Sequence, residues 1–205
     1  LEAIHPISLR FSKEDEKHFF ENTFRRQLKL VRFAFLFAML LFATFGVLDY
    51  FLFPNEVESL FTLRYIVLMP IALIASVITF TNFFRYIKEA LTFGVVVFSG
   101  ILVIVMNVLV IEHGIFNVHY AGLLLTFVFC YTFSKLQFIW ASVAGCILLL
   151  IYNVAFIWIH PIPFIELFSA SFILIALNVL GMIACYWIEY YTQIGRASCR
   201  ERVYI

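Results

Sequence analysis

Long apolar runs separated by short polar breaks cover most of the chain after residue 32. Six runs reach or approach the roughly 20 residues that a helix needs to cross a bilayer. The period-two alternation of membrane β-barrels is absent from the sequence, and unpaired backbone groups are too costly in lipid, so helices are expected. The pattern predicts an all-α integral membrane bundle of six transmembrane helices: Phe33–Phe53, Leu63–Phe80, Leu91–Ile111, Val118–Phe133, Leu136–Ile159 and Leu167–Ile188.

The polar breaks differ in their charge. Cytoplasmic loops of membrane proteins carry an excess of Lys and Arg. Basic residues are concentrated before the first run, and Arg85, Lys88 and Lys135 lie in the second and fourth connections, whereas Arg64 is assigned to the opposite side. Both termini are therefore predicted to face the cytoplasm. The fifth run begins directly after Ser134-Lys135, so the fourth and fifth helices are expected to form a tight hairpin.

The cytoplasmic segment, residues 1–30, is expected to contain an amphipathic helix. Between Phe11 and Leu30 the acidic residues come early and the basic residues late, which suits the helix dipole. Its apolar residues space roughly as one helical face: Phe19, Phe20, Phe24, Leu28 and Leu30. Such a helix would run along the inner membrane surface into the first span, either as a coupling element or as a simple interfacial anchor.

The composition changes abruptly after Tyr191. The string QIGRASCRERV (Gln193–Val203) is basic, and it resembles the in-frame translation of a sequencing adapter. We therefore expect residues 31–191 to form the transmembrane module and residues 192–205 to be a non-native tail. A genuine basic cytoplasmic tail is the alternative.

Composition supports a membrane location. Apolar residues make up 64% of the chain and charged residues 13%, with a mean hydropathy of +1.00. Soluble domains contain about 45–50% apolar and 25% charged residues. The partner that this composition indicates is the lipid bilayer, and the net charge of +1 gives no indication of nucleic acid. The four cysteines show no spacing typical of disulfides or metal sites.

The sequence carries no catalytic signature. It contains no glycine-rich phosphate loop, HExxH or GxSxG, and no carboxylate pair spaced for metal-assisted phosphoryl transfer. Catalytic residues and cofactors are therefore not expected in this fragment.

A few ionisable and aromatic residues near the helix ends are candidates for transmitting a signal. Charged groups within membrane spans are costly and suggest function. Asp49 lies in the last turn of the first helix, where it is either a proton or cation site or a carboxylate reaching headgroup water. Glu189 closes the sixth helix beside Tyr190 and Tyr191, which also fit an interfacial aromatic belt.

A second group of candidates gathers on the predicted outer face. Three imidazoles and a carboxylate have the chemistry to bind zinc or copper or to sense pH, although their spacing matches no metal motif. These residues are Glu112, His113, His119 and His160. Within the spans, polar amides are expected to hold helices together: Asn107, Asn117, Asn153 and Asn178. Ala141 and Gly145 add a small-residue packing pair.

Three stretches resemble a known module. RRQLKLVRFAFLFAMLLFATFGVLDYFLFP (Arg25–Pro54) resembles the opening of a six-helix membrane module of bacterial signalling proteins. YAGLLLTFVFCYTFSKLQFIWASVAGCILLLIYNVAF (Tyr120–Phe156) is similar to its fourth and fifth helices, and ACYWIEYYT to its exit toward a cytoplasmic output domain. The resemblance extends from Phe11 to Tyr191 and consists of pattern and scattered residues.

Such modules anchor class III adenylate and guanylate cyclases, and comparable ones precede histidine kinases and diguanylate cyclases. The resemblance implies a homodimer in the bacterial inner membrane that responds to an unidentified ligand at the outer face or within the membrane. It also implies that the signal leaves through Glu189–Tyr191. The catalytic residues of a cyclase have no counterpart in this chain. From the residues alone, a small six-helix transporter remains the alternative.

Overall fold

The computed structural model describes the backbone of residues 13–110 and 116–201, and the side chains of residues 28–110 and 121–192. The described residues form helices joined by short connections, in agreement with the predicted all-α class. The chain runs through α1 (Lys13–Leu52), α2 (Val57–Phe61), η1 (Thr62–Leu68), α3 (Met69–Ile78), α4 (Phe84–Val110), α5 (Phe116–Val128), η3 (Phe129–Phe133), α6 (Phe138–Val154), η4 (Ala155–Ile159) and α7 (Phe164–Glu201). Each η segment is a π-helical continuation of its neighbour.

Among the described residues, 5 helices are long and apolar enough to cross a membrane: Leu28–Leu52, Val57–Ile78, Phe84–Val110, Phe138–Ile159 and Phe164–Thr192. This is the pattern of a multi-pass membrane protein. The predicted fourth span appears as a shorter apolar helix, Ala121–Phe133, so the count of six remains a prediction. The residues that precede α5, 111–115, lie outside the described backbone.

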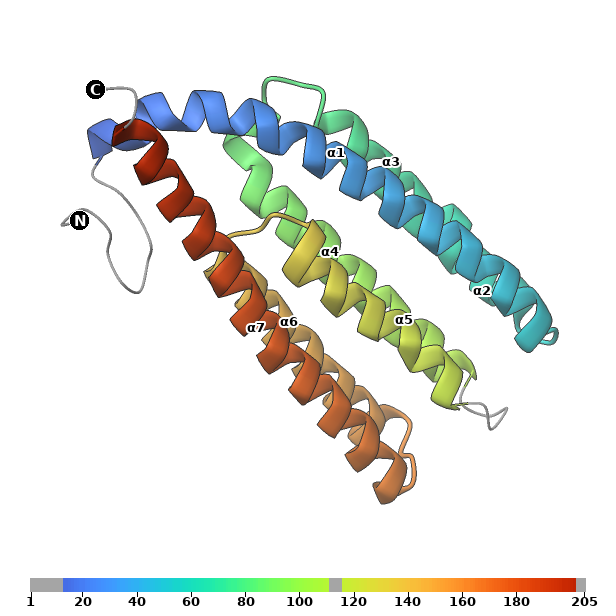
Figure 1. Cartoon of the computed structure of the whole chain (residues 1–205). Coiled ribbons are helices and arrows are strands. Elements are labelled where there is room, and N and C mark those ends of the chain that lie inside the picture. Colours follow the sequence, from blue (N-terminus) through green and yellow to red (C-terminus); the bar gives the residue numbers. More distant parts are fainter. Residues whose placement is uncertain (1–12, 111–115, 202–205) are drawn as a thin grey trace.

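The helices lie roughly side by side in one elongated bundle (Figure 1). α1 packs against α2 and α3, while α4 contacts both α5 and α6, and α7 lies against α5 and α6. The beginning of α1 and the end of α7 lie near each other at one end of the bundle (Figure 1). We call this the basic end, because Arg32, Arg85, Lys88 and Lys135 lie there, and we call the opposite end the far end.

The N-terminal segment forms part of one long helix. α1 runs without a break from Lys13 to Leu52, so the residues predicted to lie along the membrane surface continue directly into the first span. Their side chains, up to residue 27, lie outside the described set. The surface location of this segment therefore remains a prediction.

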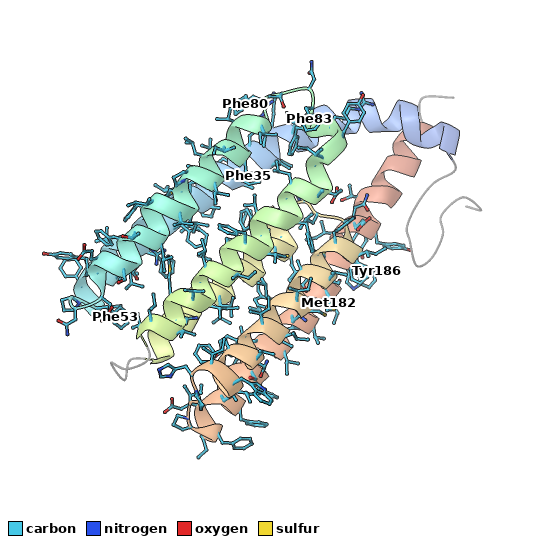
Figure 2. The ribbon with its side chains drawn as sticks, turned by 180° about the vertical axis from the view of Figure 1, so that it is seen from behind. Phe35, Phe53, Phe80, Phe83, Met182 and Tyr186 are labelled. Atoms are coloured by element: carbon cyan, nitrogen blue, oxygen red, sulfur yellow. The ribbon has the colours of Figure 1, made fainter. Side chains whose placement is uncertain are left out.

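Most of the buried core belongs to the second half of the chain. The largest cluster of buried side chains comes from α4 to α7 and includes Leu123, Phe127 and Leu148. Two smaller clusters tie α1 to its neighbours, one around Phe35 and Phe84 and one around Phe53. Figure 2 shows Phe35 along the α1–α3 side and Phe53 at the far end.

Polar contacts stabilise the connections between helices at the basic end. The Arg32 guanidinium donates a 2.9 Å hydrogen bond to the carbonyl of Thr79, which follows α3, and stacks 4.0 Å from the Phe80 ring centre. Between η3 and α6 the chain turns within a few residues, as predicted, with Lys135 in the left-handed region at φ 53°. Helix ends leave unpaired carbonyls, and a basic side chain near the last turn satisfies them.

Candidate functional site

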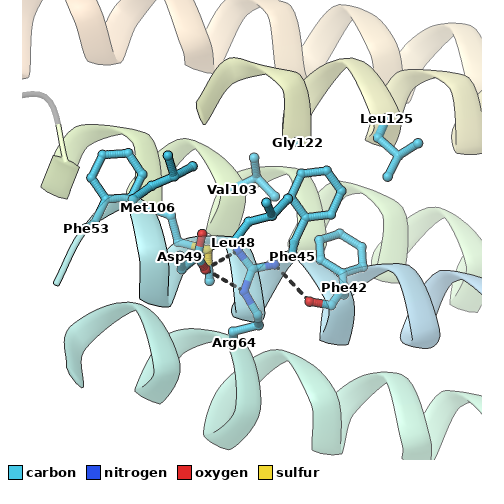
Figure 3. A pocket seen from close by; sticks show the side chains of 11 residues that line it. Phe42, Phe45, Leu48, Asp49, Phe53, Arg64, Val103, Met106, Gly122 and Leu125 are labelled. Carbon is cyan, nitrogen blue, oxygen red and sulfur yellow. Dashed lines mark hydrogen bonds and ion pairs between the residues drawn. The ribbon is translucent and has the colours of Figure 1, made fainter. Parts of the chain in front are cut away.

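A buried ion pair joins α1 to η1 near the far end. Arg64 donates from Nε and from Nη2 to the same oxygen of Asp49, Oδ2, at 2.9 Å and 2.6 Å. Its Nη1 donates to the backbone carbonyl of Phe42 at 3.1 Å (Figure 3). Asp49 and Arg64 are only 2% and 3% exposed. Two opposite charges removed from solvent are tolerated because each compensates the other.

The π-helical segment places Arg64 opposite α1. Pro70 lies in the first turn of α3 and has no backbone N–H, and its ring crowds the carbonyl four residues earlier. The helix accommodates this just upstream by widening into η1, Thr62–Leu68, which contains Arg64. π-helical turns inside α-helices are rare and are found frequently at functional sites. Within η1, Tyr65 also donates to α1, at 2.9 Å to the carbonyl of Ala43.

A small cavity of about 30 Å³ adjoins the ion pair. It is bounded by α1, η1, α4 and α5, and Figure 3 shows the pair at one of its walls. Its volume corresponds to about two water-sized groups, since one water needs roughly 10–15 Å³. Apart from Asp49 and Arg64 its wall is apolar and includes Phe42, Phe45, Leu48, Val103, Met106 and Leu125.

The carboxylate of Asp49 is buried against Arg64. Its role in transmitting a signal remains a prediction. Arg64, assigned in the sequence only to the outer side, is the functional candidate that sequence reasoning missed. The sequence places one acid and one base in consecutive spans, and ionisable groups in membranes usually pair with one another. That pattern could have indicated the Asp49–Arg64 pair.

Glu189 contacts the start of another helix at the basic end. Its Oε2 accepts a 2.8 Å hydrogen bond from the backbone N–H of Phe138, the first residue of α6. Glu89, from α4, accepts in the same way from the N–H of Gln137 at 3.2 Å. Two carboxylates from α4 and α7 thus cap the α6 N-terminus, where free N–H groups and the helix dipole favour negative charge.

The two tyrosines predicted beside Glu189 lie in an aromatic cluster. Tyr190 stacks on Tyr186 with ring centres 6.1 Å apart, and Tyr191 stacks on Trp187 at 5.4 Å. Tyr191 is 64% exposed, as a residue of an interfacial belt would be. Neither ring contacts Asp49 or Arg64, which lie toward the other end of the bundle.

Most of the predicted metal-ligand candidates lie outside the residues that the structure describes. Glu112 and His113 lie in the undescribed backbone, and the side chain of His119 is also outside the described set. His160 directly follows η4 and has a buried Nδ1 without a hydrogen-bond partner. In the described ranges no three metal-ligating side chains come together. The metal site therefore remains a prediction.

A second polar contact joins η3 to α7. The Tyr131 hydroxyl donates a short hydrogen bond to Asn178 Oδ1, and both residues are buried. The Ser171 hydroxyl of α7 donates a 2.8 Å hydrogen bond to Asn153 Oδ1 of α6. Both asparagines thus connect helices as predicted. Gly145, one of the predicted small residues, lies so close to Tyr131 and Asn178 that an added Cβ would come under 3.0 Å from each.

No protein-family model matches the sequence, and no curated protein matches it. The role of the Asp49–Arg64 pair and of the Glu189 cap is therefore inferred from their geometry.

Proposed function

We propose that the chain is the membrane-embedded sensory and anchoring module of a bacterial signalling enzyme, most plainly a nucleotide cyclase. The observation that carries the proposal is the cap at the basic end. The carboxylate of Glu189 belongs to α7, the last helix, yet it holds the first N–H of α6 at 2.8 Å. A displacement of α6 therefore pulls directly on the end of α7 that would lead to an output domain.

The course of the two longest helices fits the same proposal. α1 has 40 residues and the apolar part of α7, Phe164–Thr192, has 29, both more than the roughly 20 that a bilayer requires, and the two helices approach each other at the basic end (Figure 1). Continuous helices are stiff elements that carry a shift or rotation over their length. A homodimer would place two α7 helices side by side. Only 17% of the most apolar stretch of α7 is buried inside the bundle, compared with 50% of the corresponding stretch of α4. Most of α7 therefore faces outward.

The proposal extends to a histidine kinase or diguanylate cyclase as the output, since the membrane module would be the same. A small transporter is less well supported. Transport of a polar solute requires a polar path near the membrane midplane. The cavity beside Asp49 and Arg64 is otherwise apolar, and the two charges already neutralise each other.

The test is to fuse residues 1–191 to a class III cyclase catalytic domain and insert one to four alanines after Tyr191. If α7 transmits its orientation, cyclase activity will vary with the helical repeat of 3.6 residues. Two alanines will change activity most, and four will largely restore it. The same insertions before the catalytic domain without the membrane module serve as the control. Equal activity at all insertion lengths in the fused protein would overturn the proposal.

A second test is to sequence the source locus across the codons for Tyr191 and Thr192. A reading frame that continues into a cyclase domain supports the proposal directly. A kinase or diguanylate cyclase domain changes the output but keeps the sensory role. A stop codon at this point contradicts the proposal and favours the transporter.

A further inference from the structure

Side chains from two different helices hold the start of α6. The Glu89 carboxylate of α4 accepts a 3.2 Å hydrogen bond from the backbone N–H of Gln137. The Glu189 carboxylate of α7 accepts a 2.8 Å hydrogen bond from the N–H of Phe138. Gln137 is the N-cap of α6 and Phe138 is its first residue, so the two donors are consecutive backbone groups. α4 and α7 are therefore both bound to the same short segment.

The connection that leads into α6 is held in place by its own contacts. Ser134 is 1% exposed, and its hydroxyl donates a hydrogen bond to the carbonyl of Cys130. The same hydroxyl oxygen accepts a 3.3 Å hydrogen bond from the N–H of Leu136, which is also buried. Segments that open easily have few buried contacts, and this connection has several. It is therefore poorly suited to absorb a movement of the start of α6.

The Glu89 carboxylate is fixed through both of its oxygens. Oε2 accepts the hydrogen bond from Gln137, and Oε1 lies 3.3 Å from Lys88 Nζ. The Lys88 and Glu89 side chains are 11% and 25% exposed, so the contact is largely shielded from solvent. A side chain held at both oxygens has little rotamer freedom left. The carboxylate therefore follows the movements of α4.

α4 lies between the α1–α3 side and the α6–α7 side of the bundle (Figures 1 and 2). It contacts α3, α5 and α6. Toward the far end, its Val103 and Met106 line the cavity beside the Asp49–Arg64 pair. Glu89 lies about 21 Å from Val103 along the same helix, at 1.5 Å per residue. One continuous helix thus extends from the buried ion pair to the start of α6.

We infer that Glu89 couples α4 to α7 through the first N–H groups of α6. A movement of α4 displaces the Glu89 carboxylate and with it the N–H of Gln137. The start of α6 then shifts, and the hydrogen bond from Phe138 to Glu189 passes this shift to α7. Glu89 is thus a positioning residue for α7. The coupling itself belongs to the bundle, and its effect on an output domain rests on the proposed function.

The alternative is two independent helix caps. Acidic side chains commonly satisfy the free N–H groups at the start of a helix, and each such cap protects its own donor. Independent caps would leave the second amide and α7 unaffected when the first carboxylate is removed. Coupled carboxylates would respond together, and this difference can be measured.

The experiment measures amide hydrogen exchange of the full chain in nanodiscs, resolved to single residues by NMR. In Glu89→Ala the N–H of Gln137 loses its own acceptor and exchanges faster under either account. Coupling predicts that the N–H of Phe138, whose acceptor is intact, also exchanges about fivefold faster, as expected for the loss of one cap. The amides of residues 186–191, which lie in a different helix from Glu89, should exchange faster as well. Glu189→Ala should in turn accelerate the exchange of Gln137.

Two further variants make the result specific. Glu89→Gln keeps an acceptor oxygen without the charge, and should show the same pattern with smaller increases. Thr81→Val is the matched control at the same end of the bundle, because it removes a 2.8 Å hydrogen bond from the Thr81 hydroxyl to the carbonyl of Ile78. That bond stays within the α3–α4 connection. Its loss should leave the exchange of Phe138 and of residues 186–191 unchanged.

The inference is overturned if Glu89→Ala accelerates only the exchange of Gln137, or if Thr81→Val affects α7 equally. In the cyclase fusion, Glu89→Ala and Glu189→Ala together should change activity no more than the larger single effect, because coupled residues are not additive. Coupled exchange with unchanged fusion activity would count against the proposed function and leave the coupling intact. Independent exchange with altered activity of the Glu189→Ala fusion would overturn the coupling alone.

Discussion

Two buried polar contacts between helices, Tyr131–Asn178 and Asp49–Arg64, differ in the space around them. At Tyr131–Asn178 the helices pack tightly, because Gly145 and Gly181 allow the tyrosine side chain to lie directly on α6 and α7. At Asp49–Arg64 the contact is charged and a cavity remains beside it. Natural interiors are close-packed, so empty space beside a charged pair is unusual. The comparison separates a polar contact with tightly packed surroundings from one that borders unfilled space.

The largest expected effect comes from breaking the charged contact on one side only. Arg64→Leu removes the cation that contacts the buried Asp49 carboxylate, and should lower the free energy of unfolding by about 3–5 kcal/mol. Replacing both residues by leucine should restore stability to the wild-type level or above it. Unfolding in mixed detergent–SDS micelles, followed by circular dichroism, measures both. Equal losses in the single and double variants would show that the pair is not electrostatically coupled.

A smaller loss of stability is expected at the Tyr131–Asn178 contact. A Cβ added at Gly181 would lie under 3.0 Å from the Tyr131 ring, so Gly181→Ala forces α7 away from η3. Overpacking of this kind costs about 1–3 kcal/mol. Gly94→Ala in α4 is the matched control, because an added Cβ there meets nothing within 4 Å. It should be neutral or raise stability by about 0.5–1 kcal/mol in the same unfolding assay. A similar response of both glycines would contradict the tight packing at Tyr131.

The smallest effect on stability is expected at the basic end, where the contact is a helix cap. Glu189→Ala removes the acceptor for the Phe138 N–H and should cost about 1 kcal/mol. Glu189→Gln keeps an acceptor oxygen and should cost less. In the cyclase fusion Glu189→Ala should change activity, whereas Glu166→Ala, an exposed carboxylate at the other end of α7, should not. Unchanged activity in the Glu189→Ala fusion would show that the Glu189–Phe138 hydrogen bond does not take part in signal transmission.

The helices themselves could be predicted from the sequence because each apolar run carries its own signal. The sites could not, because they depend on distances between runs. Asp49 and Arg64 are 15 residues apart and meet only through a hairpin and a π-helical turn. Glu189 was predicted as a functional residue, but its partner Phe138 lies 51 positions away and contributes a backbone N–H that no side-chain pattern reveals. The number of spans also remains open, because the fourth run is short.

The wide turn of η1 has a consequence for comparing this chain with others. Successive residues of an α-helix are separated by about 100° of rotation. A π-helical turn holds more residues than the α-helical turn it replaces. Loss of a single codon between residues 62 and 68 would therefore let this segment return to α-helical geometry, while the helix before and after it keeps the faces that it presents. A homologue with that gap would keep its apolar run and its topology, and the change of neighbours would be confined to the turn that contains Arg64.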